Sequence, residues 1–342
     1  MSGACARWTL SRRQVMQGAG TVGLALVAGC GLLPSQAQRP ARVARLGILS
    51  PRPPNAVTAA QHEAFREGLR ALGYEEGQNL VLEFRYAETE TERLPDLAAE
   101  LVRLPVDILV AGGDATIQAA KQASETIPIV FANASAPVET GIVASLARPG
   151  GNATGLTDIS PELSGKRLQL LRDALPSLAQ VGVLWSPQFA GPALQFQETE
   201  SAARALGLDL LPCPLHGAEE IDAAFEAARR GRAEALVVLP GPITITPARR
   251  IVEQAARDRL PAMYGHPAHM DAGGLMSYGP SFADNWRRAA SYVDKVLKGV
   301  KPADLPVERP MRFDFVINAT TAHALGLTIP HHVLLQATEV IQ

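Results

Sequence analysis

The chain has 342 residues and a formal net charge of −2 at pH 7; 47% of its residues are hydrophobic and 19% are charged. A chain of this length and composition exceeds one hydrophobic core, so we expect two lobes of ordinary domain size. The near-neutral charge is unlike the basic footprint of a nucleic-acid-binding protein, and we expect no nucleic-acid partner.

The first thirty residues have the pattern of an export signal. Residues 11–16 (SRRQVM) resemble a twin-arginine motif, and the apolar run that follows is too short to span a bilayer as a helix. Residues 26–30 (LVAGC) have the pattern of a bacterial lipobox, in which the thiol of Cys30 accepts a lipid. We therefore expect a signal peptide over residues 1–29 and a tether over residues 30–43. The alternative is a buried cysteine that happens to follow an apolar run.

These N-terminal patterns also predict where the protein works. A lipobox is a bacterial feature, so we expect a lipid-anchored protein in the periplasm or on the outer face of the cytoplasmic membrane. The membrane is then a partner through the lipid on Cys30.

From residue 44 onward, short apolar runs alternate with amphipathic helical patterns, which predicts parallel sheets covered by helices on both faces. In the helical pattern at residues 59–73, Phe65, Leu69 and Leu72 fall on one stripe. The strands expected in the first half are 44–50, 80–88, 107–113, 127–133 and 153–157.

The second half repeats this plan. Each half has a buried strand that begins with an acid and ends in glycine, then a helix, and then a strand opened by a proline, Pro128 or Pro261. No unit of 20 to 50 residues recurs, so this is a duplicated layout and not a repeat array. The strands expected in the second half are 180–186, 208–215, 234–241 and 260–265.

The turn-rich segment around Pro149-Gly150-Gly151 marks the end of the first lobe, and residues 158–161 cross into the second. The segment 273–299 is expected to return a strand and a long helix to the first lobe. We therefore predict an α/β protein with two doubly wound parallel-sheet lobes and a hinge of several crossings, suited to closing on a ligand. The lobes are expected to comprise residues 44–157 plus about 275–311, and 158–274 plus about 312–342.

Five segments in the same order resemble the ABC transporter substrate-binding family that includes the tryptophan and aromatic amino-acid binding lipoproteins. The resemblance implies a type I periplasmic binding protein with a ligand in the cleft between its lobes. It also implies an ABC permease, with its ATPase, as the partner of a receptor for a small organic solute. The segments are 129–155, 164–185, 273–280, 297–310 and 315–330.

Candidate ligand-binding residues follow from the fold class, because ligands of open parallel sheets sit beyond the carboxyl ends of the strands. Most of the candidates follow directly after an expected strand, and Tyr278 also matches the pattern of the family. The candidates are Ser50, Asp114, Ala115, Thr116, Asn133, Ser135, Thr157, Asp158, Ser186 and Tyr278.

Several of these residues have an expected role in the cleft. Asp114 is placed to cap a helix at 115–124, whose free N–H groups at Ala115 can receive a carboxylate; alternatively, it holds a ligand cation. Thr116 and Ser135 offer hydroxyl donors, although both also suit ordinary turns. Tyr278 offers an aromatic wall with a polar tip, and core packing of its ring is the alternative.

The chain departs from the family pattern at three places. Many members carry Thr at the position of Asp114, Asp at the position of Ala136 and an acid near Gly241. Because a buried ammonium needs a partner, the loss of two acids weakens the case for an amine. We expect a small carboxylate-bearing solute, namely an aromatic or branched amino acid or a related acid, with amino acids slightly favoured.

Two other function classes stay open as alternatives, an α/β enzyme acting in the same cleft and a ligand-sensing domain. His266, His269 and Asp271 resemble a metal cluster, but Pro267 disturbs their helical spacing and no third ligand with standard spacing follows. Neither a G-x-S-x-G elbow nor a P-loop is found, and residues 150–155 have the wrong glycine spacing for dinucleotide binding. We expect no catalysis, no cofactor and no metal.

Overall fold

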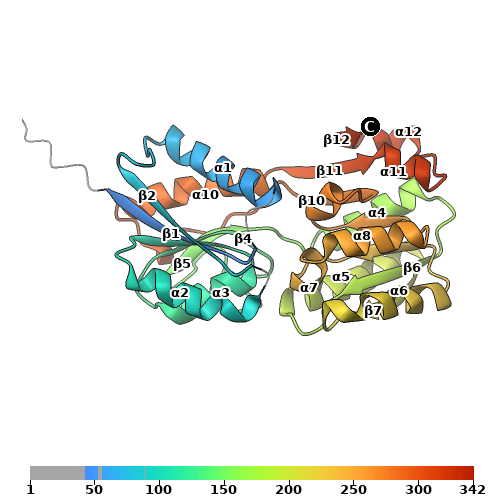
Figure 1. Ribbon diagram of the computed structural model, residues 1–342, viewed down its shortest axis with the longest axis horizontal. Helices are drawn as coiled ribbons and strands as arrows, with labels where there is room; N and C mark the ends of the chain where they lie inside the picture. Colours follow the sequence, from blue (N-terminus) through green and yellow to red (C-terminus); the bar gives the residue numbers. More distant parts are fainter. Residues whose placement is uncertain (1–42, 53–55, 89) are drawn as a thin grey trace, which may run out of the picture. The chain divides into compact units, whose positions relative to one another are not determined.

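The computed structural model describes residues 43–52, 56–88 and 90–342 (Figure 1). The signal peptide, the lipid site at Cys30 and all of the tether except Val43 lie outside the described residues, so they stay predictions. Within the described part of the chain, no helix is long and apolar enough to cross a membrane.

The first sheet is fully parallel, with strand order β2-β1-β3-β4-β5. All five strands predicted for the first half of the sequence are present. Gly155 in β5 has φ 152°, and a Cβ there would lie 1.9 Å from the carbonyl oxygen of Phe131 in β4, so only glycine fits. The strands are β1 (Ala44–Ser50), β2 (Leu80–Tyr86), β3 (Ile108–Gly112), β4 (Ile129–Ala134) and β5 (Ala153–Thr157).

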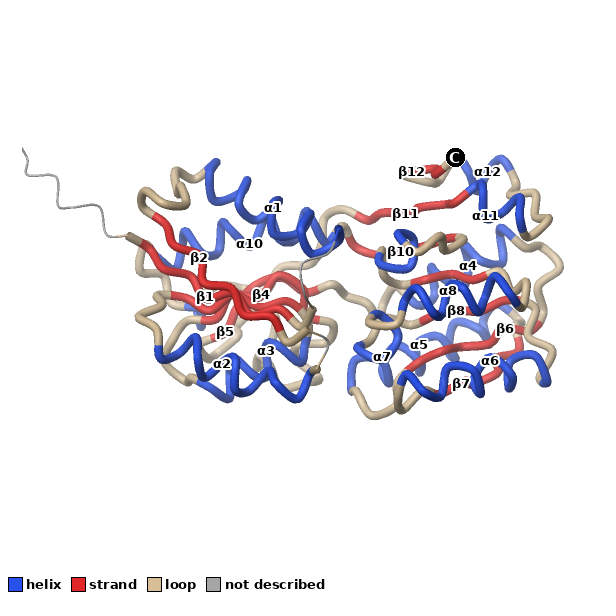
Figure 2. The backbone as a smooth tube through the Cα atoms, in the orientation of Figure 1, coloured by secondary structure: helices blue, strands red, loops and turns tan. Residues whose placement is uncertain are grey.

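Helices cover both faces of the first sheet (Figure 2). Helices α1 and α10 pack closely on one face. A Cβ at Gly68 of α1 would lie only 2.5 Å from the carbonyl oxygen of Arg287 in α10, so the close approach requires glycine there. Phe65 and Leu69 are buried as expected, whereas Leu72 lies beyond the end of α1 and is 41% exposed. The helices are α1 (Ala56–Ala71), α2 (Leu94–Arg103), α3 (Asp114–Ala123) and α10 (Phe282–Leu297), with 3-10 turns η1 (Thr91–Arg93) and η3 (Pro302–Asp304).

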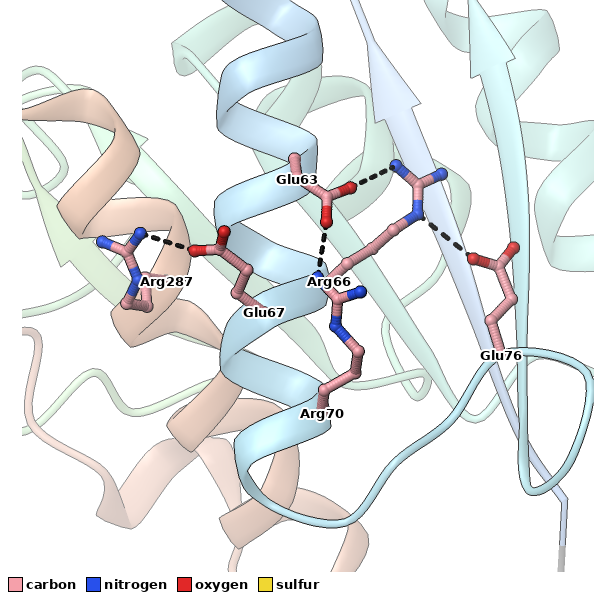
Figure 3. A network of polar contacts seen from close by, with 6 residues as sticks. All are labelled: Glu63, Arg66, Glu67, Arg70, Glu76 and Arg287. Carbon is pink, nitrogen blue, oxygen red and sulfur yellow. Dashed lines mark hydrogen bonds and ion pairs between the residues drawn. The ribbon is translucent and has the colours of Figure 1, made fainter.

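Charged side chains tie α1 to its neighbours on the exposed side (Figure 3). Arg66 contacts both Glu63 of the same helix and Glu76 of the following loop, while Glu67 pairs with Arg287 of α10. Exposed pairs of this kind contribute roughly 0–1 kcal/mol each, so the apolar contact between α1 and α10 dominates the packing.

The second sheet has the order β12-β11-β10-β9-β8-β6-β7 and is parallel except between β10 and β11. The four strands predicted for this half are present, and the two C-terminal strands were not foreseen. The strands are β6 (Gln180–Trp185), β7 (Asp209–Pro214), β8 (Ala235–Val238), β9 (Ala262–Tyr264), β10 (Met276–Pro280), β11 (Phe313–Asn318) and β12 (Glu339–Ile341).

Two apolar cores lie on the two faces of the second sheet. Leu168 of α4, Phe196 of α5 and Phe315 of β11 share one core, and Phe225 of α6 and Ile251 of α8 belong to the other. The helices are α4 (Ser164–Ala174), α5 (Ala190–Leu206), α6 (Ile221–Arg230), α7 (Pro242–Ile245), α8 (Ala248–Arg257), α9 (Ala268–Asp271), α11 (Ala319–Ala324) and α12 (His331–Leu334), with 3-10 turn η2 (Ala218–Glu220).

The segment 273–299 divides between the two sheets, which corrects the expectation that all of it returns to the first. Strand β10 pairs with β9 and β11, and Met276 is buried in the second-sheet core. Only α10 packs on the first sheet, through residues such as Trp286. The chain thus passes between the sheets three times, after β5, between β10 and α10, and between α10 and β11. The exact lobe boundaries stay a prediction.

Candidate functional site

A cavity of about 560 Å³ lies at the carboxyl ends of strands from both sheets. Seven of the ten predicted ligand residues line it, from segments that follow β1, β3, β4 and β5. Elements of the second sheet close the other side, mainly the start of α5 and the turn after β8. The seven are Ser50, Asp114, Ala115, Thr116, Asn133, Ser135 and Asp158.

The other three candidates lie elsewhere. The hydroxyl of Thr157 donates to the carbonyl oxygen of Ala134 at 2.7 Å and so holds the end of β5. Ser186 is fully buried and does not line the cavity; its Oγ would lie 3.9 Å from a Cβ at Gly241, which does. Tyr278 lines a separate cavity of about 320 Å³, and its ring stacks on Phe313.

Not every lining residue is free to bind a ligand. Thr116 directs its hydroxyl to the carbonyl oxygens of Gly112 and Gly113, each at 2.7 Å, and therefore secures the start of α3. The side chain of Asn133 pairs with that of Asn285 of α10 at 2.9 Å. The hydroxyl of Ser135, in contrast, makes no well-formed hydrogen bond to another described residue, although it lies near enough to Asp158 to lower the pKa of that carboxyl.

Asp114 has a different role from the predicted helix cap. Helix α3 begins at Asp114 itself, and Gly113 is the N-cap residue with φ 90°. The carboxylate of Asp114 reaches across to β4 and accepts the backbone N–H of Ser135 at 2.8 Å. The cap prediction was wrong because glycine at 113 lets the chain turn one residue earlier.

Asp158 lies on the other side of the same β4 end. Its backbone N–H donates to Ala134 at 2.9 Å, and its carboxylate accepts the N–H of Ser160 at 2.9 Å. Asp114 and Asp158 therefore flank Ser135 and Ala134, the residue after β4 and its last residue. Among the described residues, no basic side chain forms an ion pair with either carboxylate. We call these two residues the acid pair.

Burial dominates the electrostatics of the acid pair. It raises the pKa of Asp114 to about 7, with a further increase from the charge of Asp158 and a decrease from the N–H of Ser135. Burial also raises the pKa of Asp158, while the hydrogen bonds of Ser160 and the charge of Arg167 oppose the rise. Two carboxylates in one enclosed space resist double ionisation, so the pair titrates as a coupled unit.

Two arginines at the site were missed from the sequence. Arg52 lines the cavity just after β1, its Nε is buried without a hydrogen-bond partner, and burial lowers its pKa to about 10. Arg167 of α4 is fully buried behind Asp158 and donates to the carbonyl oxygens of Tyr278 at 2.8 Å and Ser160 at 3.1 Å. The position of Arg52 after a strand end is a signal that could have identified it.

The two sides of the cavity differ in charge. Among the lining residues that the structure describes, Arg52, Asp114, Glu139 and Asp158 carry formal charges, and all four belong to first-sheet elements. The second-sheet side is largely apolar and includes no such side chain; burial keeps the pKa of its His266 well below the ordinary value. Its apolar lining consists of Phe189, Ala190, Pro192, Pro240, Pro242 and Ile245.

Gly191 in the first turn of α5 lies against the acid pair. A Cβ at Gly191 would be 3.1 Å from Oδ2 of Asp114 and 3.3 Å from Oγ of Ser135. The second-sheet side therefore approaches the free oxygen of Asp114 closely. No sequence pattern marked this glycine.

The expected absence of a metal was argued from the spacing of His266, His269 and Asp271. In the structure, the ring nitrogens of His269 lie 3.1 Å from the carbonyl oxygen of His266 and 3.0 Å from that of Thr244. His269 thus contacts backbone oxygens on both sides of its ring. Within the described ranges, no group of three or more His, Cys, Asp or Glu side chains is placed to hold a metal ion.

Comparison with known proteins agrees with this architecture. A curated tyrosine-binding protein of Clostridioides difficile is 24% identical over 266 residues, which cover 78% of this chain and 76% of the relative. A solved conserved domain protein from Vibrio cholerae is 28% identical with a TM-score of 0.81, over 87% of this chain and all of that one. An ABC domain from Streptococcus pneumonia, solved in complex with L-Trp, is 25% identical with a TM-score of 0.81, over 87% of this chain and 99% of that one.

The model of the family described as ABC transporter substrate binding protein matches residues 55–341. The match covers nearly the whole described chain, and the solved relatives share its two α/β sheets. The chain belongs to this family.

Proposed function

We propose that this family member is the solute-binding receptor of an ABC importer and that it captures an aromatic α-amino acid. The observation that carries the proposal is the division of the cavity into a charged side and an apolar side. A free amino acid has the same division, with a zwitterionic head and an apolar side chain. The tyrosine-binding relative and the relative solved with L-Trp support the same class of solute.

The acid pair suits the ammonium group of such a ligand. Oδ2 of Asp114 and the hydroxyl of Ser135 both face Gly191, and Asp158 lies on the other side of the same strand end. A buried ammonium is costly unless it is paired and hydrogen-bonded. Asp114 and Asp158 supply the acids that the sequence comparison found missing at Ala136 and Gly241, so the amine is favoured more than the sequence suggested.

Arg52 suits the carboxylate group of the ligand. Its guanidinium lines the same cavity with an Nε that lacks a partner, and arginine binds carboxylates through paired, charge-assisted hydrogen bonds. The apolar side chain of the ligand would then contact Phe189, Pro240 and Ile245 on the second-sheet side. Because each side of the cavity binds a different part of the ligand, binding favours the closed arrangement.

The importer role adds partners outside this chain. We propose an ABC permease with its ATPase as the docking partner, extracytoplasmic placement of the receptor, and anchoring through a lipid on Cys30. Membership of the transporter family supports the permease, and the lipobox pattern supports the anchor.

Calorimetry on a ligand panel tests the proposal. The panel contains L-tryptophan, L-tyrosine, L-leucine, glucose and putrescine, and each is titrated into the wild-type chain, Arg52→Gln and the matched control Asp209→Asn. Asp209 is exposed at the start of β7, far from the carboxyl ends of the strands. We expect tight binding of aromatic amino acids, a loss of at least about tenfold in Arg52→Gln, and no change in the control. Tight binding of glucose or putrescine alone, indifferent to Arg52→Gln, would overturn the assignment.

A further inference from the structure

In the empty receptor, ionisation of both carboxyl groups of the acid pair is unfavourable. Asp114 and Asp158 sit at the end of β4, and neither has a cation within ion-pairing distance among the described residues. The donors beside them are uncharged: the backbone N–H groups of Ser135 and Ser160 and, near Asp158, the hydroxyls of the same two serines. Two full negative charges in this enclosed space would be compensated only by these neutral donors and, beyond ion-pairing distance, by the charge of Arg167.

The other ionisable groups around the acid pair do not neutralise its negative charge by forming an ion pair with it. Arg167 of α4 lies behind Asp158, but its hydrogen bonds go to carbonyl oxygens. Arg52 after β1, Glu139 after β4, His62 of α1 and His266 after β9 line the same cavity. Both histidines are neutral at pH 7, because burial lowers the pKa of His62 to about 4 and holds that of His266 well below its ordinary value. Glu139 adds negative charge.

We propose that the acid pair of the empty receptor carries one proton, and that the ammonium group of an incoming ligand displaces it. The inference rests on the proposed function, because it needs an amine as ligand. The exchange is balanced: the ammonium keeps its three protons, the carboxylic acid loses one proton to solvent, and the pair changes from one negative charge to two as one positive charge arrives.

The surroundings also indicate which residue holds the proton. Asp158 accepts the N–H of Ser160 and feels the positive charge of Arg167, and both favour its ionised form. Asp114 accepts a single N–H and feels the negative charge of Asp158. Asp114 is therefore the protonated member, and its free Oδ2 beside Gly191 is the atom that exchanges a proton for the ammonium.

Proton exchange makes loading depend on pH. The pKa of Asp114 is about 7 in the empty receptor and falls when an ammonium arrives. Binding therefore releases close to one proton at pH 6 and almost none at pH 8. As the pH increases toward 7, affinity for an amine therefore rises by roughly tenfold per pH unit, and above pH 7 it levels off.

Two experiments test the exchange with separate probes. Calorimetry of L-tryptophan in phosphate and in MOPS at pH 6 and pH 8 gives the number of protons released, because both buffers accept protons in this range and they differ in ionisation enthalpy. The expected result is close to one proton at pH 6 in the wild type and in the control Asp209→Asn, and none in Asp114→Asn. Binding of L-tryptophan at pH 6 without proton release would overturn the proposal.

Carbon NMR of carboxyl-labelled aspartate tests the empty receptor without L-tryptophan. One resonance, absent in Asp114→Asn, should titrate near pH 7, and ethylammonium chloride should lower its midpoint while equal sodium chloride leaves it unchanged. An Asp114 that is ionised throughout pH 5 to 8, or a midpoint insensitive to ethylammonium, would overturn the exchange. Failure of L-tryptophan to bind would instead count against the proposed function, and the NMR result would still decide the exchange.

Discussion

Replacing Arg167 with methionine should destabilise the receptor far more than an ordinary substitution in a helix. Arg167 connects α4 to two crossing regions of the chain, through the carbonyl oxygens of Tyr278 at 2.8 Å and Ser160 at 3.1 Å. It is fully buried, so methionine fills part of the space but removes the arginine donor from both oxygens, and the oxygen of Ser160 keeps only the N–H of Leu163 at 3.3 Å. Each unpaired buried carbonyl costs about 1–3 kcal/mol.

The net cost is smaller than the sum of these two losses. Burial of the guanidinium already lowers its pKa to about 10, which shows that the charge is held at some expense, and methionine removes this expense. We therefore expect a loss of about 2–4 kcal/mol in the free energy of unfolding, out of roughly 5–15 kcal/mol for a typical protein.

Urea denaturation at pH 7 measures this loss, and Lys166→Met is the matched control. Lys166 lies next to Arg167 in the same helix and is only half-buried. The control should change stability by less than about 0.5 kcal/mol, as most partly exposed substitutions do. If Arg167→Met costs no more than the control, the two hydrogen bonds do not stabilise the crossings and the reasoning fails.

Three further predictions concern the backbone, the titration of the fold and the N-terminus. Gly155→Ala should reduce soluble, folded protein severely, because its Cβ would lie 1.9 Å from the carbonyl oxygen of Phe131; normal expression and thermal stability would contradict the observed β4–β5 packing. The ligand-free receptor should lose stability as the pH rises from about 4 to 7, because native Asp114 keeps a proton that the unfolded chain has already released; thermal melts of Asp114→Asn should lack this part of the decline. Cys30→Ser should release the protein from membranes, and unchanged membrane retention and mass would argue against the lipobox.

Much of the fold was predictable because parallel strands buried on both faces appear as short apolar runs. The segments at 44–50 and 153–157 form strands with these bounds, and Gly155 was part of a predicted strand. The place of β10 was not predictable in this way. Tertiary packing decides that β10 pairs with β9 and β11, and nothing in a strand of five residues indicates to which sheet it belongs.

The candidate site was predictable to the level of strand ends and no further. Position after a strand correctly placed Asp114, Ser135 and Asp158 at the cavity, but side-chain direction decided the rest. Thr157 turns its hydroxyl to the end of the neighbouring strand β4, and Tyr278 lines the second cavity. Arg167 lies in α4, the helix that directly follows Asp158 in the sequence, but it is not at a strand end, so the rule based on strand ends did not select it.

The affinity ratio between L-tryptophan and indole-3-propionate at pH 8 tests the central claim most directly. The two ligands share the indole and the carboxylate, and only L-tryptophan has an ammonium group for the acid pair. An unpaired buried charge or a lost charged hydrogen bond costs about 2–5 kcal/mol, so L-tryptophan should bind at least roughly 30-fold more tightly. Equal binding of the two ligands, or tighter binding of indole-3-propionate, would contradict an ammonium site at Asp114 and Asp158.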